Sequence, residues 1–175
     1  AWTPIGGSDW AFAGTFDGRG HTISGLTVGS AAAPLALDSG NLFIGLFGVL
    51  EKTAVVRDVA LRNVAFYTSY EATAYVGGIA GLSSAGIRSS WAKLTLSGKS
   101  SVGGIVGSGS EDTSLSAGSG CTVTDCRSLV VVEDCDQFSG AISGRDLGVF
   151  RGNYFVSDVL RGIDRRSLSG QAEPM

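Results

Sequence analysis

A short glycine-rich phrase recurs four times along the chain and constrains its fold more than any other feature. The copies are Gly45-Leu46-Phe47-Gly48, Gly77-Gly78-Ile79-Ala80-Gly81, Gly103-Gly104-Ile105-Val106-Gly107 and the degenerate Gly140-Ala141-Ile142-Ser143-Gly144. Their final glycines stand at 48, 81, 107 and 144, so the copies are 33, 26 and 37 residues apart. Uneven spacing around a constant phrase is typical of a solenoid, in which one strand per turn is kept and the loops vary.

A second pattern follows each copy at a similar distance. Its first position is occupied by Val56, Ile87, Val123 and Phe150. Apolar or small residues stand three and five positions later, namely Val59, Ser90, Cys126 and Asn153, then Leu61, Ala92, Ser128 and Phe155. The position between them is predicted to face outward, and it holds Ala60, Trp91, Arg127 and Tyr154. This is the pattern of strands with period 2 that are interrupted by a bend, whereas an amphipathic helix would repeat at 3, 4 and 7.

These repeats predict an all-β fold in which successive turns stack through parallel ladders, because one turn cannot bury its own apolar face. Glycine is expected to supply positive φ at the corners and to let backbones approach closely. Roughly six or seven turns, at about 4.8 Å each, would form a rod about 30 Å long. The predicted buried core contains Leu46, Phe47, Val59, Leu61, Ile79 and Ile105.

Composition agrees with short strands and tight turns, since 27 of the 175 residues are glycine and only 17% are charged. The net charge of −3 gives no reason to expect a nucleic-acid partner. No apolar stretch approaches the roughly 20 residues that span a bilayer, so we expect no membrane insertion. The chain begins with Ala1, and we interpret it as a segment of a longer protein.

The opening of the chain resembles the GLUG-repeat family. The resemblance is carried by Trp2-Thr3-Pro4-Ile5-Gly6 and by the run from Phe12 through Asp17-Gly18-Arg19-Gly20-His21 to Leu26, and the glycine phrases resemble the GLUG motif itself. It covers residues 2 to about 158. The resemblance implies a right-handed parallel β-helix like that of filamentous haemagglutinin-type adhesins, outside the cell or on a bacterial surface. GLUG repeats also occur in non-catalytic regions of immunoglobulin A proteases. We therefore expect a repeat segment over 1–160 and an irregular tail or connector over 161–175, which covers one end.

The residues that could carry chemistry are few. His21 is the single histidine, which excludes a His-Glu-x-x-His zinc protease and favours a polar turn residue. Tetrahedral zinc needs four nitrogen or sulfur ligands, but Cys121, Cys126 and Cys135 contain no Cys-x-x-Cys pair. Cys126 occupies an inward position and is predicted to be a small buried thiol; a disulfide with Cys121 or Cys135 is the alternative. We expect no cofactor and no metal.

Acidic and aromatic residues leave two further possibilities. Acidic residues cluster at Glu133, Asp134 and Asp136 and at Glu111 and Asp112. Polysaccharide lyases with a β-helix fold use clustered carboxylates with calcium, but no Asp-x-Asp-x-Asp-Gly loop occurs, so solvated turns are the simpler interpretation. Five aromatic residues could stack on carbohydrate or instead cover the core, namely Trp10, Tyr67, Tyr70, Trp91 and Tyr154.

Together these features predict a non-catalytic structural or binding module of a large bacterial surface or secreted protein that resembles an adhesin. Its expected partners are a host glycan, a host protein or neighbouring domains of the parent chain. The alternatives are a carbohydrate-active β-helix enzyme, either a lyase or a glycosidase, and an accessory segment of an immunoglobulin A protease. A glycosidase would need two facing carboxylates, which a sequence alone does not place.

Overall fold

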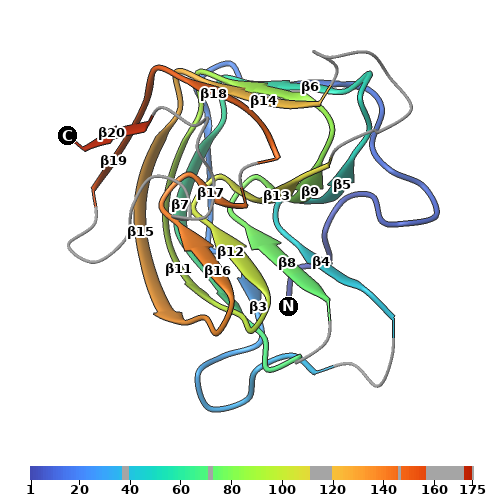
Figure 1. Cartoon of the computed structure of the whole chain (residues 1–175), viewed down its shortest axis with the longest axis vertical. Helices are drawn as coiled ribbons and strands as arrows, with labels where there is room; N and C mark the ends of the chain where they lie inside the picture. The colour runs from blue at the N-terminus through green and yellow to red at the C-terminus, as the bar shows by residue number, and fades with distance from the viewer. Residues whose placement is uncertain (37–39, 71–72, 111–119, 146, 157–171, 175) are drawn as a thin grey trace.

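The computed structural model describes residues 1–36, 40–70, 73–110, 120–145, 147–156 and 172–174 (Figure 1). Every regular element in these ranges is a β-strand, so the predicted all-β class with little or no helix is confirmed. In this part of the chain no helix is long and apolar enough to cross a membrane.

The strands form four sheets, and every strand pair in them is parallel. Sheet I has the order β1 (Thr15–Asp17), β6 (Val55–Arg57), β10 (Gly86–Arg88), β14 (Cys121–Thr124) and β18 (Gly148–Arg151). Sheet II has the order β2 (Thr22–Ser24), β7 (Ala60–Tyr67), β11 (Trp91–Ser97), β15 (Arg127–Asp134), β19 (Asn153–Val156) and β20 (Ala172–Pro174), and β3 (Thr27–Val28) also pairs with β7.

The other two sheets have four strands each. Sheet III has the order β4 (Leu42–Ile44), β8 (Ala74–Gly77), β12 (Ser101–Gly103) and β16 (Phe138–Gly140). Sheet IV has the order β5 (Phe47–Leu50), β9 (Ala80–Ser83), β13 (Val106–Gly109) and β17 (Ser143–Arg145).

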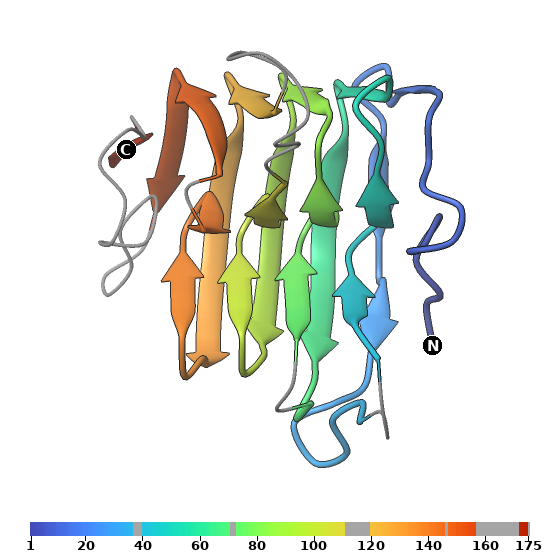
Figure 2. The ribbon, with the colours of Figure 1, turned by 45° about the vertical axis from the view of Figure 1, so that its right-hand side comes forward.

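The chain passes through sheets I, II, III and IV in turn and then returns to sheet I; we call one such passage a circuit. Each circuit pairs with the one before it, so the strands of a sheet lie side by side in chain order from blue to red (Figure 2). The described residues hold four complete circuits, which begin at β1, β6, β10 and β14, and a fifth that begins at β18. Sheet II extends over six successive strands, because β20 pairs beyond β19, and this agrees with the lower end of the predicted six or seven turns. Each full circuit uses about 30 residues, as the spacing of the glycine phrases indicates.

The glycine phrases align across the circuits, the degenerate fourth copy included. Phe47, Ala80, Val106 and Ser143 are paired in register in sheet IV. The residues before them are fully buried or nearly so, and they are Leu46, Ile79, Ile105 and Ile142. Val59 and Leu61 are buried too, which confirms the predicted core.

Close approach of backbones explains why these phrases need glycine. A Cβ on Gly103 would clash with the carbonyl oxygen of Val106 and lie 2.6 Å from the amide nitrogen of Gly144. The phrase glycines themselves do not have positive φ. Among the described residues, positive φ occurs at glycines of other turns, namely Gly6, Gly20, Gly25, Gly29, Gly40 and Gly152, and at non-glycine residues of the bend between sheets I and II, such as Asp58 (53°), Ser89 (49°) and Asp125 (53°).

The second pattern is also in register, since Ile87 pairs with both Val56 and Val123, and Val123 pairs with Phe150. Ala60 is buried although its position faces outward. Its register partners are Thr22 and Trp91, whose larger side chains stand on either side of its single methyl group.

Both ends of the stack carry extra contacts. At the first circuit, Trp2 Nε1 donates a 2.9 Å hydrogen bond to the carbonyl of Gly45, and the ring of Phe12 lies 4.8 Å from that of Phe47. At the last circuit, β20 pairs with β19. The tail over 161–175 was expected to be irregular, and the strand within it corrects that expectation; residues 157–171 and 175 lie outside the described part of the chain.

Candidate binding face

The outward side of sheet II brings two of the aromatic candidates, Trp91 and Tyr154, together with cationic residues in rows that cross the strands. The first row contains Trp91, Arg127 and Tyr154, which are consecutive register partners on β11, β15 and β19. The second row, two residues further along each strand, contains Arg62, Lys93, Leu129 and Val156. Side chains two residues apart share one face of a strand, so the two rows form a continuous surface.

Cationic and aromatic side chains from both rows form one part of this surface. Arg62, Lys93 and Arg127 are exposed, and the guanidinium carbon of Arg62 lies 5.6 Å from the centroid of the Trp91 ring. The ion pairs found among the described residues join Arg57 to Asp17 and Lys99 to Asp134 and Asp136. The three cations of the surface therefore have no carboxylate partner within the described residues.

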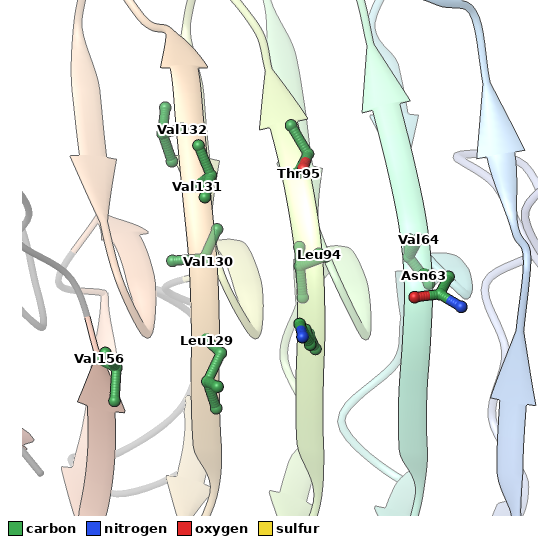
Figure 3. Close-up of a pocket in the computed structure, with 10 residues that line it drawn as sticks. Asn63, Val64, Leu94, Thr95, Leu129, Val130, Val131, Val132 and Val156 are labelled. Atoms are coloured by element: carbon green, nitrogen blue, oxygen red, sulfur yellow. The ribbon is translucent and has the colours of Figure 1, made fainter.

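The other part of this surface is a groove lined mainly by aliphatic side chains. A groove of about 470 Å³ crosses β7, β11, β15 and β19 (Figure 3). Val131 is 58% exposed, Val156 46% and Leu129 37%, and together they form an exposed apolar patch. The groove is lined by Asn63, Val64, Lys93, Leu94, Thr95, Leu129, Val130, Val131, Val132 and Val156.

A separate polar hollow of about 420 Å³ lies where β7, β11 and β15 end. Lys99 Nζ lies 2.5 Å from Asp134 Oδ2 and 3.5 Å from Asp136 Oδ2. The hydroxyl of Tyr67 donates a long 3.4 Å hydrogen bond to Glu133 Oε1. The hydrogen bond to Asp134 raises the pKa of Lys99, and burial together with the Glu133 carboxylate raises the pKa of Tyr67.

In the acidic cluster of residues 133–136, Asp134 and Asp136 thus pair with Lys99 and Glu133 with the Tyr67 hydroxyl, while all three carboxylate side chains remain exposed. Glu111 and Asp112 lie outside the described residues. His21 is exposed in the turn before β2, where its amide donates a 2.8 Å hydrogen bond to the carbonyl of Gly18. Among the described residues no group of three or more His, Cys, Asp or Glu side chains could hold a metal ion.

All three cysteines are free thiols. Cys126 is fully buried, as its inward position predicted, and burial raises the pKa of both Cys121 and Cys126 to about 12. Cys135 is partly buried, and its pKa is raised by burial as well. A thiol reacts as the thiolate, so Cys121 and Cys126 are poor nucleophiles at neutral pH.

The aromatic candidates separate into two groups. Tyr67, Trp91 and Tyr154 lie on sheet II. Tyr70 is buried and its hydroxyl donates a 2.6 Å hydrogen bond to the carbonyl of Gly40, while Trp10 is 77% exposed in the N-terminal segment.

Sequence reasoning missed the second row. Its residues stand two positions after the predicted outward residues, so the row could have been found by extending the alignment of the repeats by two residues.

Comparison with known proteins gives one partial likeness. No protein-family model and no solved structure matches the chain. The chain is similar to part of Halomucin from Haloquadratum walsbyi. The two are 34% identical over 99 residues, which is 57% of this chain and 1% of Halomucin. The chain therefore spans about a hundredth of the length of this relative, and the resemblance to GLUG repeats rests on the residues of the chain itself.

Proposed function

We propose that this chain is a non-catalytic structural and binding module of a large extracellular or cell-surface protein, folded as a right-handed parallel β-helix. The observation that carries the proposal is the in-register pairing of successive circuits in all four sheets. Each circuit packs mainly on its neighbours, which is the arrangement of repeat proteins that gain length by adding units.

The module is suited to spacing and display. Its circuits bury one continuous core that runs from Leu26 and Val28 to Phe150 and Phe155. The outer residues of the strands are free to vary without disturbing that core, because inward and outward side chains alternate. The adhesin-like character implied by the GLUG resemblance is part of the same proposal, and the likeness to a small portion of Halomucin supports a place within a much larger protein.

Two experiments test the proposal. A crystal structure of the chain is expected to show a right-handed coil; a left-handed coil or separated sheets would contradict the fold. Antibodies raised against the purified chain are expected to label intact cells of the source organism. Labelling that appears only after the cells are permeabilised would contradict the surface location.

The polar hollow favours a second candidate function, a carbohydrate-active enzyme. Lys99, Tyr67 and the carboxylates of Glu133 and Asp134 line one hollow, and side chains of these types serve as general acids and bases in enzymes. The purified chain should be incubated with neutral and anionic polysaccharides, with and without calcium, while new reducing ends and unsaturated products are followed. Turnover that is lost in Glu133→Ala and Asp134→Ala would replace the non-catalytic proposal.

The accessory-segment alternative concerns the parent protein. A zinc-protease sequence in the parent gene would place the chain beside the catalytic domain of an immunoglobulin A-type protease. Its absence from the full gene would remove this alternative.

A further inference from the structure

We propose that the outer face of sheet II binds an anionic polysaccharide, through Arg62, Lys93 and Arg127 together with Trp91 and Tyr154. This inference rests on the proposed binding role of the module and names its ligand class and its site. The residues come from four neighbouring strands, β7, β11, β15 and β19, and so from four successive circuits.

The geometry suits a linear ligand that runs across the strands. Register partners in neighbouring strands are about 4.8 Å apart, which is close to the rise of one pyranose unit in an extended chain. Trp91 and Tyr154 stand two strands apart with Arg127 between them, so their rings are roughly 10 Å apart along the row. An extended polysaccharide can therefore meet an aromatic ring at every second sugar and a guanidinium group at the sugar between.

The charge of the site selects an anionic ligand. Three cationic side chains of the site are exposed and have no ion-pair partner among the described residues. They are Arg127 in the first row and Arg62 and Lys93 in the second. A guanidinium group binds carboxylate or sulfate through two parallel hydrogen bonds, and Lys93 adds a point charge beside Arg62 in the register. Uronate and sulfated sugars carry the matching groups.

The aromatic residues supply the contact with the sugar ring. Tyr154 is 40% exposed, and Trp91 is partly buried with the Arg62 guanidinium above its ring. That cation–π contact holds the indole in place and keeps the guanidinium at the surface. Aromatic rings present large, rigid apolar faces, on which the C–H side of a pyranose can stack.

A polysaccharide fits the site better than a single-stranded nucleic acid does. Nucleic-acid binding requires a positively charged groove that follows a closely charged backbone and stacks successive bases on aromatic rings. Here the two rings of the row are separated by an arginine, and the groove beside them is lined mainly by aliphatic side chains such as Leu129, Val131 and Val156.

The test measures binding of the full chain to polygalacturonate, to a sulfated polysaccharide and to a neutral glucan by titration calorimetry. We expect binding to one or both anionic polymers, weakened by salt, and none to the glucan. Lys93→Gln and Arg127→Gln should each weaken binding by about tenfold, or about 1.4 kcal/mol, because each variant loses a hydrogen bond from a charged donor to the ligand. Lys52→Gln, an exposed lysine in the loop between β5 and β6, is the matched control and should bind like the parent chain.

Three outcomes would overturn the inference. These are absence of binding to both anionic polymers, equal weakening by Lys93→Gln and Lys52→Gln, and tighter binding of a single-stranded oligonucleotide than of either polysaccharide. Because Trp91→Ala could disturb folding, Trp91→Phe is used to test the ring contact, with unfolding by denaturant measured alongside. None of these outcomes bears on the handedness of the coil or on its surface location, so failure here is distinguishable from failure of the proposed function.

Discussion

The amide N–H of Cys126 donates a 3.0 Å hydrogen bond to Oδ1 of Asn153, which occupies the same position one circuit later. The Asn153 amide group also donates a 2.8 Å hydrogen bond to the carbonyl of Val123. Ser90 Oγ accepts the amide N–H of Val59 in the same way at 3.2 Å, and the Cys126 thiol donates a 3.3 Å hydrogen bond to the carbonyl of Thr124. Side chains thus replace the ladder hydrogen bonds that the bend between sheets I and II interrupts.

The first prediction concerns this column of hydrogen bonds. Asn153→Ala leaves the Cys126 amide and the Val123 carbonyl buried without their partner, so we expect a loss of about 2–4 kcal/mol in the free energy of unfolding. Ser128→Ala is the control, because the Ser128 hydroxyl is buried with no hydrogen-bond partner among the described residues. Its removal should be neutral or slightly stabilising in urea unfolding. A stability loss in the control as large as in Asn153→Ala would contradict the assignment.

The second prediction concerns the stacked core. Ile105 is fully buried between Ile79 and Ile142. The Ile79 amide donates a 2.9 Å hydrogen bond to the Ile105 carbonyl, and the Ile105 amide donates one of 2.9 Å to the Ile142 carbonyl. Ile105→Ala should cost about 2–5 kcal/mol, through lost burial and a residual cavity. Val131→Ala, at a side chain that is 58% exposed, should change stability by less than about 0.5 kcal/mol. Equal effects in denaturant unfolding would show that the inward register is misassigned.

The third prediction concerns thiol reactivity. At pH 8 and under native conditions, iodoacetamide should modify Cys135 first, because Cys121 and Cys126 are buried with pKa values of about 12. All three should react in urea, where burial is lost. Mass spectrometry of timed digests gives the order, and rapid native labelling of Cys126 would show that the bend opens.

The fourth prediction is a loss of stability at alkaline pH. The folded pKa of Cys121 and Cys126 lies above the ordinary value of 9.0, so the folded state holds these protons more tightly than the unfolded state does. Their contribution is therefore fully present below about pH 9 and is lost as the pH rises towards 12. Each thiol can contribute up to about 4 kcal/mol to this loss. Urea unfolding at pH 7, 9 and 10.5 should show it, and Cys121→Ala should reduce the slope.

The fifth prediction concerns the end of the stack. β20 pairs with the free edge of β19, and an uncovered parallel edge can pair with another chain. Deletion of residues 161–175 should therefore increase dimer formation or aggregation in light scattering. Unchanged scattering at matched concentration would show that the tail has no protective role.

The strand register could be predicted because its signal is local. Val56, Ile87, Val123 and Phe150 were aligned by their apolar character and by the bend that follows them, and a shift of one residue would turn every apolar side chain outward. The glycine phrases were equally informative, since a side chain at Gly103 would clash with the neighbouring backbone. The hydrogen-bond role of Asn153 was not predicted, because the same position of an earlier circuit is occupied by Val59, whose side chain cannot form a hydrogen bond.

The sequence by itself determined the all-β class, the inward residues and the alignment of one circuit on the next. Both signals are local, because alternating apolar residues mark the inward side of a strand and glycines mark the points where backbones of neighbouring circuits approach closely. Only the tertiary structure decided the number of circuits, the pairing of Lys99 with Asp134 and Asp136, and the surface that joins Trp91, Arg127 and Tyr154. Neighbouring residues in these pairs and in this row are 27 to 37 positions apart in the sequence, and no local preference links them. They become neighbours because each circuit closes on the one before it, and the lengths of the intervening loops fix which outer side chains meet.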